Sequence, residues 1–593
     1  MRSPQRRSLV CLAPLWLTAV ACAAPTSTGD GSPDGADEVG ITAGKGDGSG
    51  FSECELQKVV ELLNDASTDL GMLRNAGVHS RAAGNLMAHR NGQDGVFGTG
   101  DDQPFADITA VDDVSWVGPV AIRQLVAVVT DRCAATDTAD VEVIFSPQTY
   151  ESSHLARTKE LLDSATRSID VAMYSFSDSP IREALERAVA RGVSIRVILE
   201  AANAEHAAPS GTMSARLEDA GMDVRWINKI MHHKFAIIDG VRSDLDDPAE
   251  AILVTGSGNW SNSAGTRYDE NTLVIRRNAE LALRFQGEFN TLWNHSRDLE
   301  WNASLEYFES LPITDAMIED DPAVDAAFTS ANFRTTVSSS YGNTFSVERG
   351  RNAISDRLVE LIGRATRSVH VASGHLRSRP VAEALMAKHA ADPAIDIRIY
   401  LDDQEWISYT SHAEQVRDLE SCLASAGDSE SRRQDCIDRG FYFGYQAHLE
   451  GIPVRYKFYA YRWDYSYAVQ MHHKFMIVDG RWLATGSYNL SDNAEHNTME
   501  NMIFLDGAAY PATVASYEQR FEQMWVTGES EGLYDSLMEN VSNGTGSFPI
   551  VFESMALDWP QVDALKRAIR DACPNINTAP FRDNPTAHRF CNR

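Results

Sequence analysis

The chain has 593 residues, of which 43% are hydrophobic, so it has material for several domains with substantial cores. Asp and Glu outnumber Lys and Arg by 84 to 53, and the net charge is −31. This charge argues against a protein that coats nucleic acid, because such proteins need a basic surface. It leaves room for a small basic pocket that takes a single phosphodiester.

The N-terminal residues have the pattern of an export signal. Three arginines precede an apolar run, 9–20, which is too short to span a membrane. The small residues 19–21 offer a cleavage site, and Cys22 follows them, as in the lipidation box of bacterial lipoproteins. The usual Leu three residues before the Cys is missing, so ordinary secretion is the alternative. We predict a signal peptide over 1–21 and an exported bacterial protein, either an outer-membrane lipoprotein attached through Cys22 or a secreted protein.

The next two segments precede the main body of the chain. Residues 22–50 are rich in small and polar residues and predict a flexible linker. Residues 51–135 have helical apolar spacing and predict a small helical domain. Within it, 105–129 resembles a helix-hairpin-helix unit, whose Gly-containing turn presents N–H groups to a phosphate; a purely structural helical module is the alternative. The acidic loop 91–102 lacks the spacing of an EF-hand, which favours a solvated loop over a calcium site.

From residue 141 the pattern changes to strands that alternate with helices, which predicts layered α/β structure. The pattern occurs twice, since Ala165-Thr-Arg-Ser168 is repeated 200 residues later as Ala365-Thr-Arg-Ser368. We therefore predict two duplicated α-β-α sandwich domains that form one pseudo-twofold unit, over 136–300 and 346–530. Residues 301–345 are expected to connect them, and 531–593 to form a C-terminal tail.

The strongest signal is a ten-residue stretch that is written twice. Met231-His-His-Lys-Phe-Ala-Ile-Ile-Asp-Gly240 is matched by Met471-His-His-Lys-Phe-Met-Ile-Val-Asp-Gly480. Each copy is followed by Gly-Ser-x-Asn and then by Glu-Asn, so two sets of polar residues recur at matched places: Ser257, Asn259, Glu270 and Asn271, and Ser487, Asn489, Glu500 and Asn501. Matched sets of this kind predict one active site built from two halves of a single chain, which favours a monomer.

The residues after each His-x-Lys form the apolar pattern of a buried strand that ends at an Asp-Gly turn. Residues i and i+2 of a strand face the same side, so His232 and Lys234 are expected to point together, as are His472 and Lys474. Asp239 and Asp479 have the opposite parity. We include both among the candidate catalytic residues and expect them to support the turn rather than to touch substrate.

The pattern H-x-K-x4-D followed by G-S-x-N resembles the phospholipase D superfamily of phosphodiesterases, over roughly residues 141–300 and 345–530. The resemblance implies that one imidazole attacks phosphorus and the other protonates the leaving alcohol and then activates water. In this family the first motif often supplies the nucleophile, which suggests His232, with His472 as acid and base. The resemblance also implies that neither a metal nor another cofactor is required.

The remaining site residues have roles that fit an anionic substrate. Lys234, Lys474, Asn259 and Asn489 are expected to bind the non-bridging phosphate oxygens. Ser257 and Ser487 are candidates either for phosphate contact or for support of a turn. Glu270 and Glu500 are candidates for carboxylates that bond the far imidazole nitrogen and set its tautomer.

Six cysteines beyond residue 22 fall into neighbouring pairs, and the simplest disulfide pairing is Cys54–Cys133, Cys422–Cys436 and Cys573–Cys591. Unpaired buried thiols are the alternative. The second copy of the repeat carries about 40 further residues before its motif, which we expect to hold Cys422 and Cys436.

The sequence leaves the substrate open. Export, possible attachment to a membrane surface and the acidic charge favour phospholipid, either hydrolysed or transferred to another alcohol. The helix-hairpin-helix-like unit keeps nucleic acid as the alternative substrate, and a non-catalytic surface binding protein is a third possibility. The aromatic stretch 455–467 is expected either to line the substrate rim or to form a hairpin with cross-strand aromatic pairs.

Overall fold

The computed structural model describes residues 51, 53–129, 137, 139–299, 310–338, 342–544, 546–584 and 589–592. The predicted signal peptide, the linker and Cys22 lie outside these residues, as do the side chains needed to test the Cys54–Cys133 pairing. The chain divides into two compact units at Cys133/Ala134, and each is described by itself.

The first unit is helical, with α1 (Glu53–Asn64), α2 (Leu70–Asn75), α3 (Ser80–Arg90), α4 (Ile108–Asp112) and α5 (Pro119–Val129). Asp69 and Asp107 cap α2 and α4 by accepting hydrogen bonds from backbone N–H groups. The turn between α4 and α5 exposes Trp116, whose φ is 71°. In the acidic loop, Asp101 accepts from the backbone N–H groups of Gln93 and Asp94, so its carboxylate holds the loop's own backbone.

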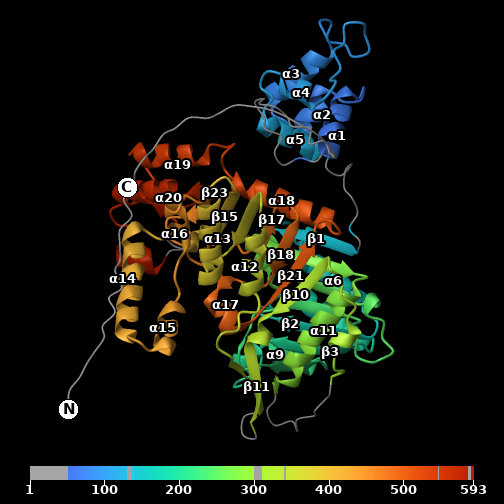
Figure 1. Ribbon diagram of the computed structural model, residues 1–593, viewed down its shortest axis with the longest axis vertical. Helices are drawn as coiled ribbons and strands as arrows, with labels where there is room; N and C mark the ends of the chain where they lie inside the picture. The colour runs from blue at the N-terminus through green and yellow to red at the C-terminus, as the bar shows by residue number, and fades with distance from the viewer. Residues whose placement is uncertain are drawn as a thin grey trace, which may run out of the picture. The chain divides into compact units, whose positions relative to one another are not determined.

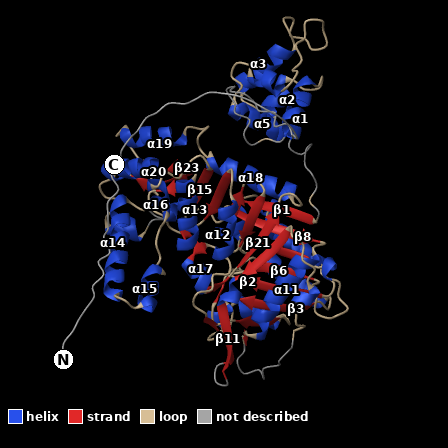
Figure 2. Cartoon of the chain, viewed as in Figure 1, coloured by secondary structure: helices blue, strands red, loops and turns tan. Residues whose placement is uncertain are grey.

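The second unit contains two eight-stranded mixed sheets with the same strand order, and helices flank the strands (Figures 1 and 2). The first sheet has the order β1-β8-β7-β6-β2-β3-β4-β9 and the second β10-β21-β18-β17-β13-β15-β16-β23. In each, the central strands are parallel and the motif strand (β6 or β17) runs antiparallel to them. The predicted duplicated α/β fold is thereby confirmed.

The first half takes up residues 139–299. Its strands are β1 (Asp140–Ser146), β2 (Ser168–Met173), β3 (Ser194–Leu199), β4 (Asp223–Trp226), β6 (Lys234–Ile238), β7 (Ile252–Gly256), β8 (Glu270–Arg276) and β9 (Arg297–Asp298). Its helices are α6 (His154–Ser164), α7 (Ser179–Ala190), α8 (Ala202–Glu205), α9 (Met213–Asp219), α10 (Asn262–Thr266) and α11 (Ala279–Asn294).

The second half repeats this order. Its strands are β10 (Val324–Phe328), β13 (Ser368–Ser373), β15 (Asp396–Asp402), β16 (Val454–Ala460), β17 (Lys474–Val478), β18 (Trp482–Gly486), β21 (Asn501–Asp506) and β23 (Val551–Asp558). Its helices are α12 (Ser355–Arg364), α13 (Arg379–Ala391), α14 (Tyr409–Ala426), α15 (Glu430–Ile437), α16 (Gly444–Leu449), α17 (Asp492–His496), α18 (Pro511–Trp525), α19 (Leu533–Ser542), α20 (Trp559–Ala572) and α21 (Ala579–Asp583).

Short two-stranded pairings complete the unit. They join β5 (Ile230–Met231) to β20 (Thr498–Met499), β11 (Phe333–Ser338) to β12 (Gly342–Val347), β14 (Leu376–Arg377) to β19 (Leu490–Ser491), and β22 (Phe548–Pro549) to β24 (Phe590–Cys591).

The edges of the second sheet differ from the predicted domain boundaries. β10 lies within the expected connecting segment, yet it pairs with β21 as β1 pairs with β8. β23 lies within the expected tail, yet it pairs with β16, the place that β9 has beside β4. An edge strand has one partner strand, so its sequence is less constrained, and the repeat is hard to see there. Residues 324–328 and 551–558 therefore belong to the second domain.

One apolar cluster joins the two halves. It includes Phe285 and Phe289 of α11, Phe475 of β17, and Tyr517 and Phe521 of α18, all buried. Burial of large aromatic side chains is among the strongest contributions to a stable interface, on the order of 2 kcal/mol or more for each side chain. The halves therefore share one core, which fixes the position of each motif relative to the other.

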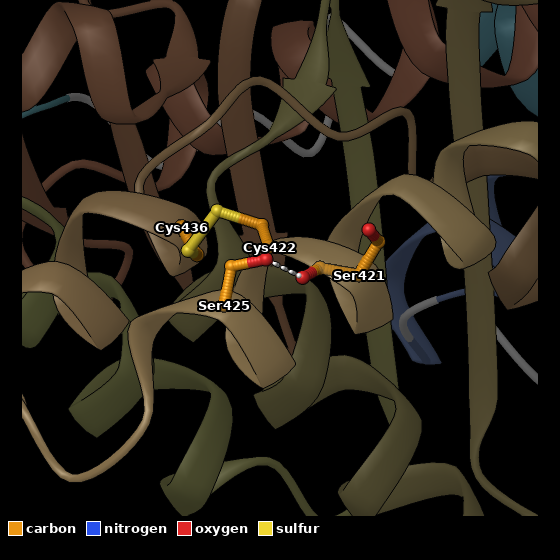
Figure 3. Close-up of a disulfide and its surroundings, with 4 residues drawn as sticks. All are labelled: Ser421, Cys422, Ser425 and Cys436. Atoms are coloured by element: carbon orange, nitrogen blue, oxygen red, sulfur yellow. Dashed lines mark hydrogen bonds between the residues drawn. A yellow bond between two sulfur atoms is a disulfide. The ribbon is translucent and has the colours of Figure 1, made fainter.

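The expected insertion in the second half is a helical hairpin made by α14 and α15, coloured orange in Figure 1. A disulfide between Cys422 and Cys436 joins the two helices, and Ser425 Oγ donates to the Ser421 carbonyl oxygen beside it at 2.8 Å (Figure 3). A second disulfide joins Cys573 to Cys591. Two of the three predicted pairings are confirmed.

The aromatic stretch 455–467 is neither wholly a rim nor a hairpin. Its first part is β16, an interior strand of the second sheet, in which Tyr456, Phe458 and Tyr459 are buried. Its second part is a loop from which Tyr465 projects, 67% exposed.

Across the described residues, none of the helices combines the length and apolar character that a membrane span requires.

Candidate active site

The two motif strands hold equivalent places in the two sheets. Lys234 is the first residue of β6 and Lys474 the first residue of β17, and each histidine lies two residues earlier. All five residues of each strand are buried, because the strand lies in the interior of its sheet. The apolar run after each lysine therefore anchors the His-x-Lys segment to a rigid element.

Each motif histidine is paired with a glutamate from the other half. His472 Nδ1 lies 2.7 Å from Glu270 Oε1 in a hydrogen bond, and His232 Nδ1 lies 2.7 Å from Glu500 Oε1. Both glutamates are at most 1% exposed. The sequence predicted that these carboxylates bond the far imidazole nitrogen, but it did not reveal that the pairs cross between the halves.

Backbone pairing between the halves holds these crossed pairs in place. β5 runs parallel to β20, and the N–H of His232 donates to the carbonyl of Met499 at 3.2 Å. On the other side the N–H of His472 donates to the carbonyl of Asp269 at 2.9 Å. Each histidine is thus bonded through its backbone to the segment that carries its glutamate.

The two lysines lie beside the histidines and are almost completely buried. Lys234 Nζ donates to the His232 carbonyl and Lys474 Nζ to the His472 carbonyl, each at 2.6 Å. Burial lowers the pKa of Lys234 to about 7 and that of Lys474 to about 8, although the neighbouring glutamates oppose the change. An anion between the two ammonium groups would restore their charge, as expected of a phosphate site.

Burial also sets the protonation of the histidine–glutamate pairs. It raises the pKa of Glu270 and of Glu500 to about 7. Burial and the nearby lysines lower the pKa of His232 and of His472 well below the usual range. When a histidine–glutamate pair holds one proton, on Nδ1, the lone pair of Nε2 is free to attack. When it holds a second proton, Nε2–H can be donated to a leaving group, so the same residues can act as base or as acid.

Each Gly-Ser-x-Asn segment begins at the last residue of β7 or β18, and its Ser and Asn lie beyond the strand. Ser257 and Ser487 are fully buried. Ser257 Oγ accepts from the N–H of Asn271, and Ser487 Oγ accepts from the N–H of Asn501 and donates to Glu500 Oε2. Of the two expected roles, phosphate contact or structural support, this geometry favours support, since both hydroxyls hold the glutamate segments.

The two asparagines of these segments keep a buried polar atom available for a ligand. Asn259 Oδ1 and Asn489 Oδ1 are buried and have no hydrogen-bond partner among the described residues. A buried polar atom without a partner costs free energy, which a bound substrate or water would recover. An amide could also be oriented with its N–H₂ toward the same place, where it would donate to a phosphate oxygen.

The two aspartates of the motif lie at the far end of the strand from the histidines. Asp239 and Asp479 adopt φ angles of 54° and 57° at the turns that end β6 and β17. Asp239 accepts from the N–H groups of Thr166, Arg167 and Ser168, and Asp479 repeats these contacts with residues 366–368. They support the turn, as expected, and anchor the repeated Ala-Thr-Arg-Ser segment, so their inclusion among the catalytic residues is corrected.

The second histidine of each motif joins the halves. His233 contacts Glu288 and Asn501, and His473 contacts Asn271 and Arg520. In each half, the Glu-Asn pair thus makes two contacts with the motif of the other half. The glutamate contacts the first histidine of that motif, and the asparagine contacts the second. The sequence could not reveal the partners on α11 and α18, because Glu288 and Arg520 differ in charge and lie outside the repeated motifs.

Two further carboxylates hold the backbone just before the histidines. Glu200 Oε2 accepts from the Met231 N–H at 2.6 Å, and Asp402 Oδ2 accepts from the Met471 N–H at 2.7 Å. Glu200 directly follows β3 and Asp402 is the last residue of β15, and neither belongs to a motif, so the sequence did not single them out. Among the described residues, no group of three or more His, Cys, Asp or Glu side chains is placed to hold a metal ion.

Comparisons with known proteins agree with this architecture. Residues 158–293 and 358–525 match the family described as "Cardiolipin synthase, PLD-like domain", which places one copy in each half. Together these spans make up more than half of the chain.

Among curated proteins, mitochondrial cardiolipin hydrolases are similar to part of the chain. The protein from Drosophila melanogaster is 30% identical over 152 residues, which are 24% of this chain and 58% of that protein. The protein from Chlamydomonas reinhardtii is 32% identical over 153 residues, 25% of this chain and 62% of that protein. The chain therefore spans about three fifths of the length of these relatives.

Two solved structures are also similar. The phospholipase D family member Nuc from Salmonella typhimurium is 29% identical, with a TM-score of 0.23 over 27% of this chain and 98% of that one. Phosphatidylserine synthase from Haemophilus influenzae is 13% identical, with a TM-score of 0.39 over 64% of this chain and 85% of that one. The doubled motif, the crossed histidine–glutamate pairs and the family match over both halves show that the chain belongs to the phospholipase D superfamily.

Proposed function

We propose that the chain is a phosphodiesterase of the phospholipase D type that hydrolyses phospholipids through a phosphohistidine intermediate. The observation that carries this proposal is the pair of crossed His–Glu contacts beside two buried lysines. A phosphodiester placed between them would meet a nucleophile, an acid and two cations on one scaffold.

The first half of the reaction assigns a role to each pair. Nε2 of His232 attacks phosphorus while the Glu500 carboxylate, 2.7 Å from Nδ1, stabilises the positive charge of the imidazole. The bond from phosphorus to the leaving alcohol breaks, and Nε2–H of His472 protonates that oxygen. Lys234, Lys474 and the two asparagines stabilise the negative charge on the non-bridging oxygens. The product is a phosphoramidate between His232 and the phosphatidyl group.

The second half reverses the role of His472. Its Nε2, now without a proton, takes one from water as the water oxygen attacks phosphorus. The P–N bond breaks, phosphatidate leaves, and His232 returns with its lone pair on Nε2. An alcohol in place of water would give transfer of the phosphatidyl group instead of hydrolysis.

Phospholipid is proposed as the substrate class because of the family match and the curated cardiolipin hydrolases. Export, as a lipoprotein attached at Cys22 or as a secreted protein, belongs to the same proposal. The N-terminal signal pattern supports it, and the disulfides Cys422–Cys436 and Cys573–Cys591 fit an oxidising compartment. Such a protein would meet its substrate at a membrane surface.

A nuclease is the second candidate. Its support is the α4–α5 hairpin of the first unit, whose turn exposes Trp116 beside Arg81, with the guanidinium 4.6 Å from the ring centroid. An exposed aromatic with a neighbouring cation could stack on a base. The net charge of −31 opposes binding of long nucleic acid.

One experiment separates the two candidates. The full chain is incubated in EDTA with phosphatidylethanolamine or phosphatidylglycerol vesicles and, separately, with plasmid DNA. His232→Ala and His472→Ala serve as matched controls. Release of a head group by the wild type alone supports the proposal. Nicking of DNA without lipid cleavage, lost in both variants, would overturn it in favour of the nuclease.

A further inference from the structure

The two halves of the active site differ at a pair of positions that lie at the carboxyl ends of two parallel strands. In the first half, Tyr174 directly follows β2 and Glu200 directly follows β3. The strands are parallel neighbours with Met173 opposite Leu199, and the Glu200 N–H donates to the Met173 carbonyl at 3.2 Å. Tyr174 and Glu200 are therefore adjacent at the carboxyl end of the sheet.

Tyr174 reaches the reacting groups. Its ring centroid lies 4.5 Å from that of His232, and Lys234 Nζ lies 5.0 Å from the centroid. The side chain is nevertheless 38% exposed, so one side of this tyrosine faces the catalytic histidine and another part faces solvent. Tyr174 thus marks the mouth of the site on the side of the first half.

Glu200 lies beside this mouth with spare acceptor capacity. One oxygen, Oε2, accepts from the Met231 N–H, and among the described residues the side chain makes no other hydrogen bond or ion pair. The residue is only half-buried. Burial raises the pKa of Glu200, and its carboxylate adds to the elevation of the pKa of Tyr174. A cation that bound here would offset the partial desolvation of this carboxylate.

The equivalent positions of the second half cannot do the same. Gly374 takes the place of Tyr174, and Asp402 takes the place of Glu200, since Ser373 lies opposite Leu401 in the parallel pair β13 and β15. Asp402 is fully buried and accepts from the Met471 and Gln404 N–H groups and from Tyr459 OH. The internal twofold symmetry is therefore broken by an accessible carboxylate on one side only.

A loop of the second half contacts the first half near this region. Arg267 NH2 donates to the Ala468 carbonyl at 2.9 Å and ties the 461–469 loop to the first half. Tyr465 of that loop is 67% exposed, and its phenol contributes to the elevated pKa of both Tyr174 and Tyr268. The phenols of Tyr174, Tyr268 and Tyr465 are therefore near enough for Tyr465 to affect the pKa of the other two.

We propose that Glu200, with Tyr174, forms a subsite for a cationic ammonium head group, so that the enzyme prefers amine-bearing phospholipids to lipids whose head group is an uncharged polyol. The inference rests on the proposed phospholipase activity and deepens it. A carboxylate beside an aromatic ring is a typical environment for an ammonium ion, because the face of the ring and the carboxylate both attract positive charge. The neighbouring lysines would hold the phosphate that accompanies it.

A binding measurement tests the subsite without relying on turnover. Isothermal titration calorimetry on the full chain compares phosphoethanolamine with glycerol 3-phosphate, which share the phosphate and differ in the ammonium group. We expect the wild type to bind phosphoethanolamine about tenfold more tightly. Glu200→Gln keeps an acceptor for the Met231 N–H but loses the charge, and should bring the two affinities together. Asp402→Asn, the matched variant of the other half, should keep the preference.

A kinetic measurement tests whether the subsite serves the reaction. With phosphatidylethanolamine and phosphatidylglycerol vesicles, Glu200→Gln should lower the ratio of the two kcat/KM values about tenfold, mainly through KM. Equal binding of the two phosphomonoesters by the wild type, no binding of either, or a ratio that Glu200→Gln leaves unchanged would each overturn the subsite. If the wild type cleaves neither lipid, the lipase proposal fails, and the calorimetric result still decides the role of Glu200.

Discussion

Glu270 Oε1 lies 2.7 Å from His472 Nδ1, although 202 residues separate them along the chain. The reciprocal contact joins Glu500 to His232. Neither half therefore contains a complete catalytic pair, and each histidine depends on the other half for the carboxylate that sets its tautomer.

The crossed pairs predict that each of the two glutamates is required for full activity, even when both His-x-Lys motifs are intact. Glu270→Gln or Glu500→Gln should lower kcat about 100-fold or more, because a neutral amide no longer stabilises the charge that its imidazole carries. Steady-state hydrolysis of a soluble phosphodiester such as bis(p-nitrophenyl) phosphate measures the effect. Glu250→Gln, in an exposed loop ion pair with Arg167, is the control. Equal activity of Glu270→Gln and this control would contradict the assignment.

The pH dependence should be bell-shaped, with its maximum near neutral pH. Burial raises the pKa of Glu270 and Glu500 to about 7. Below that pH both pairs hold their second proton, Nε2 of the nucleophile is blocked, and the rate falls. Above it neither pair can protonate the leaving group. Lys234 and Lys474, with pKa values of about 7 and 8, lose charge on the same alkaline side.

A profile of kcat/KM against pH measures these groups in the free enzyme. Glu500 belongs to the pair of the nucleophile His232, so Glu500→Gln should remove the acidic limb of the profile and leave the alkaline limb in place. A profile that rises steadily from pH 6 to pH 9 in the wild type would show that the pairs do not titrate as described.

The assignment of the nucleophile predicts different behaviour of the two histidine variants. With a p-nitrophenyl leaving group, which needs little protonation, His472→Ala should still form the phosphoramidate on His232 but hydrolyse it slowly. Mass spectrometry of the intact chain would detect the added mass. His232→Ala should show none. Labelling of His232→Ala and not of His472→Ala would exchange the two roles.

The anchoring role of Asp239 predicts a loss of stability rather than of chemistry. Asp239→Ala removes the acceptor for three backbone N–H groups and should cost about 1–3 kcal/mol of unfolding free energy. Asp479→Ala should behave alike. Thermal unfolding is compared with that of Asp244→Ala, at an exposed position of the neighbouring loop. If kcat falls strongly while the melting temperature stays, Asp239 has a direct role in catalysis.

The two disulfides should differ in what they stabilise. Replacing Cys422 and Cys436 by Ser releases the α14–α15 hairpin, and limited proteolysis within 409–437 should become faster while hydrolysis persists. Replacing Cys573 and Cys591 loosens the segment that follows β23, an edge strand of the second sheet, and should lower the melting temperature of the whole unit. Each loop closure is worth about 3 kcal/mol in the chain-entropy account.

Much of the fold could be predicted, because the duplicated halves show the same sequence pattern twice. Strand and helix periodicity gave the interior elements, from β2 to α7 and β3, and the doubled His-x-Lys located the site. The edges were less visible. β10 and β23 each pair on one side only, so their residues are weakly constrained, and the sequence predicted that they lie in the connecting segment 301–345 and in the C-terminal tail.

The sequence by itself located the site, because His, Lys, Asn and Glu recur at matched spacing, and this pattern resembles the phospholipase D superfamily, which implies phosphodiester chemistry. Only the tertiary structure decided which groups meet. The shared apolar core and the β5–β20 pairing bring Glu500 to His232 and Glu270 to His472, contacts that no local periodicity encodes. Buried Ser257 became a support and Asp239 an anchor for the same reason: burial and partners, which depend on distant residues, assign the role of a side chain.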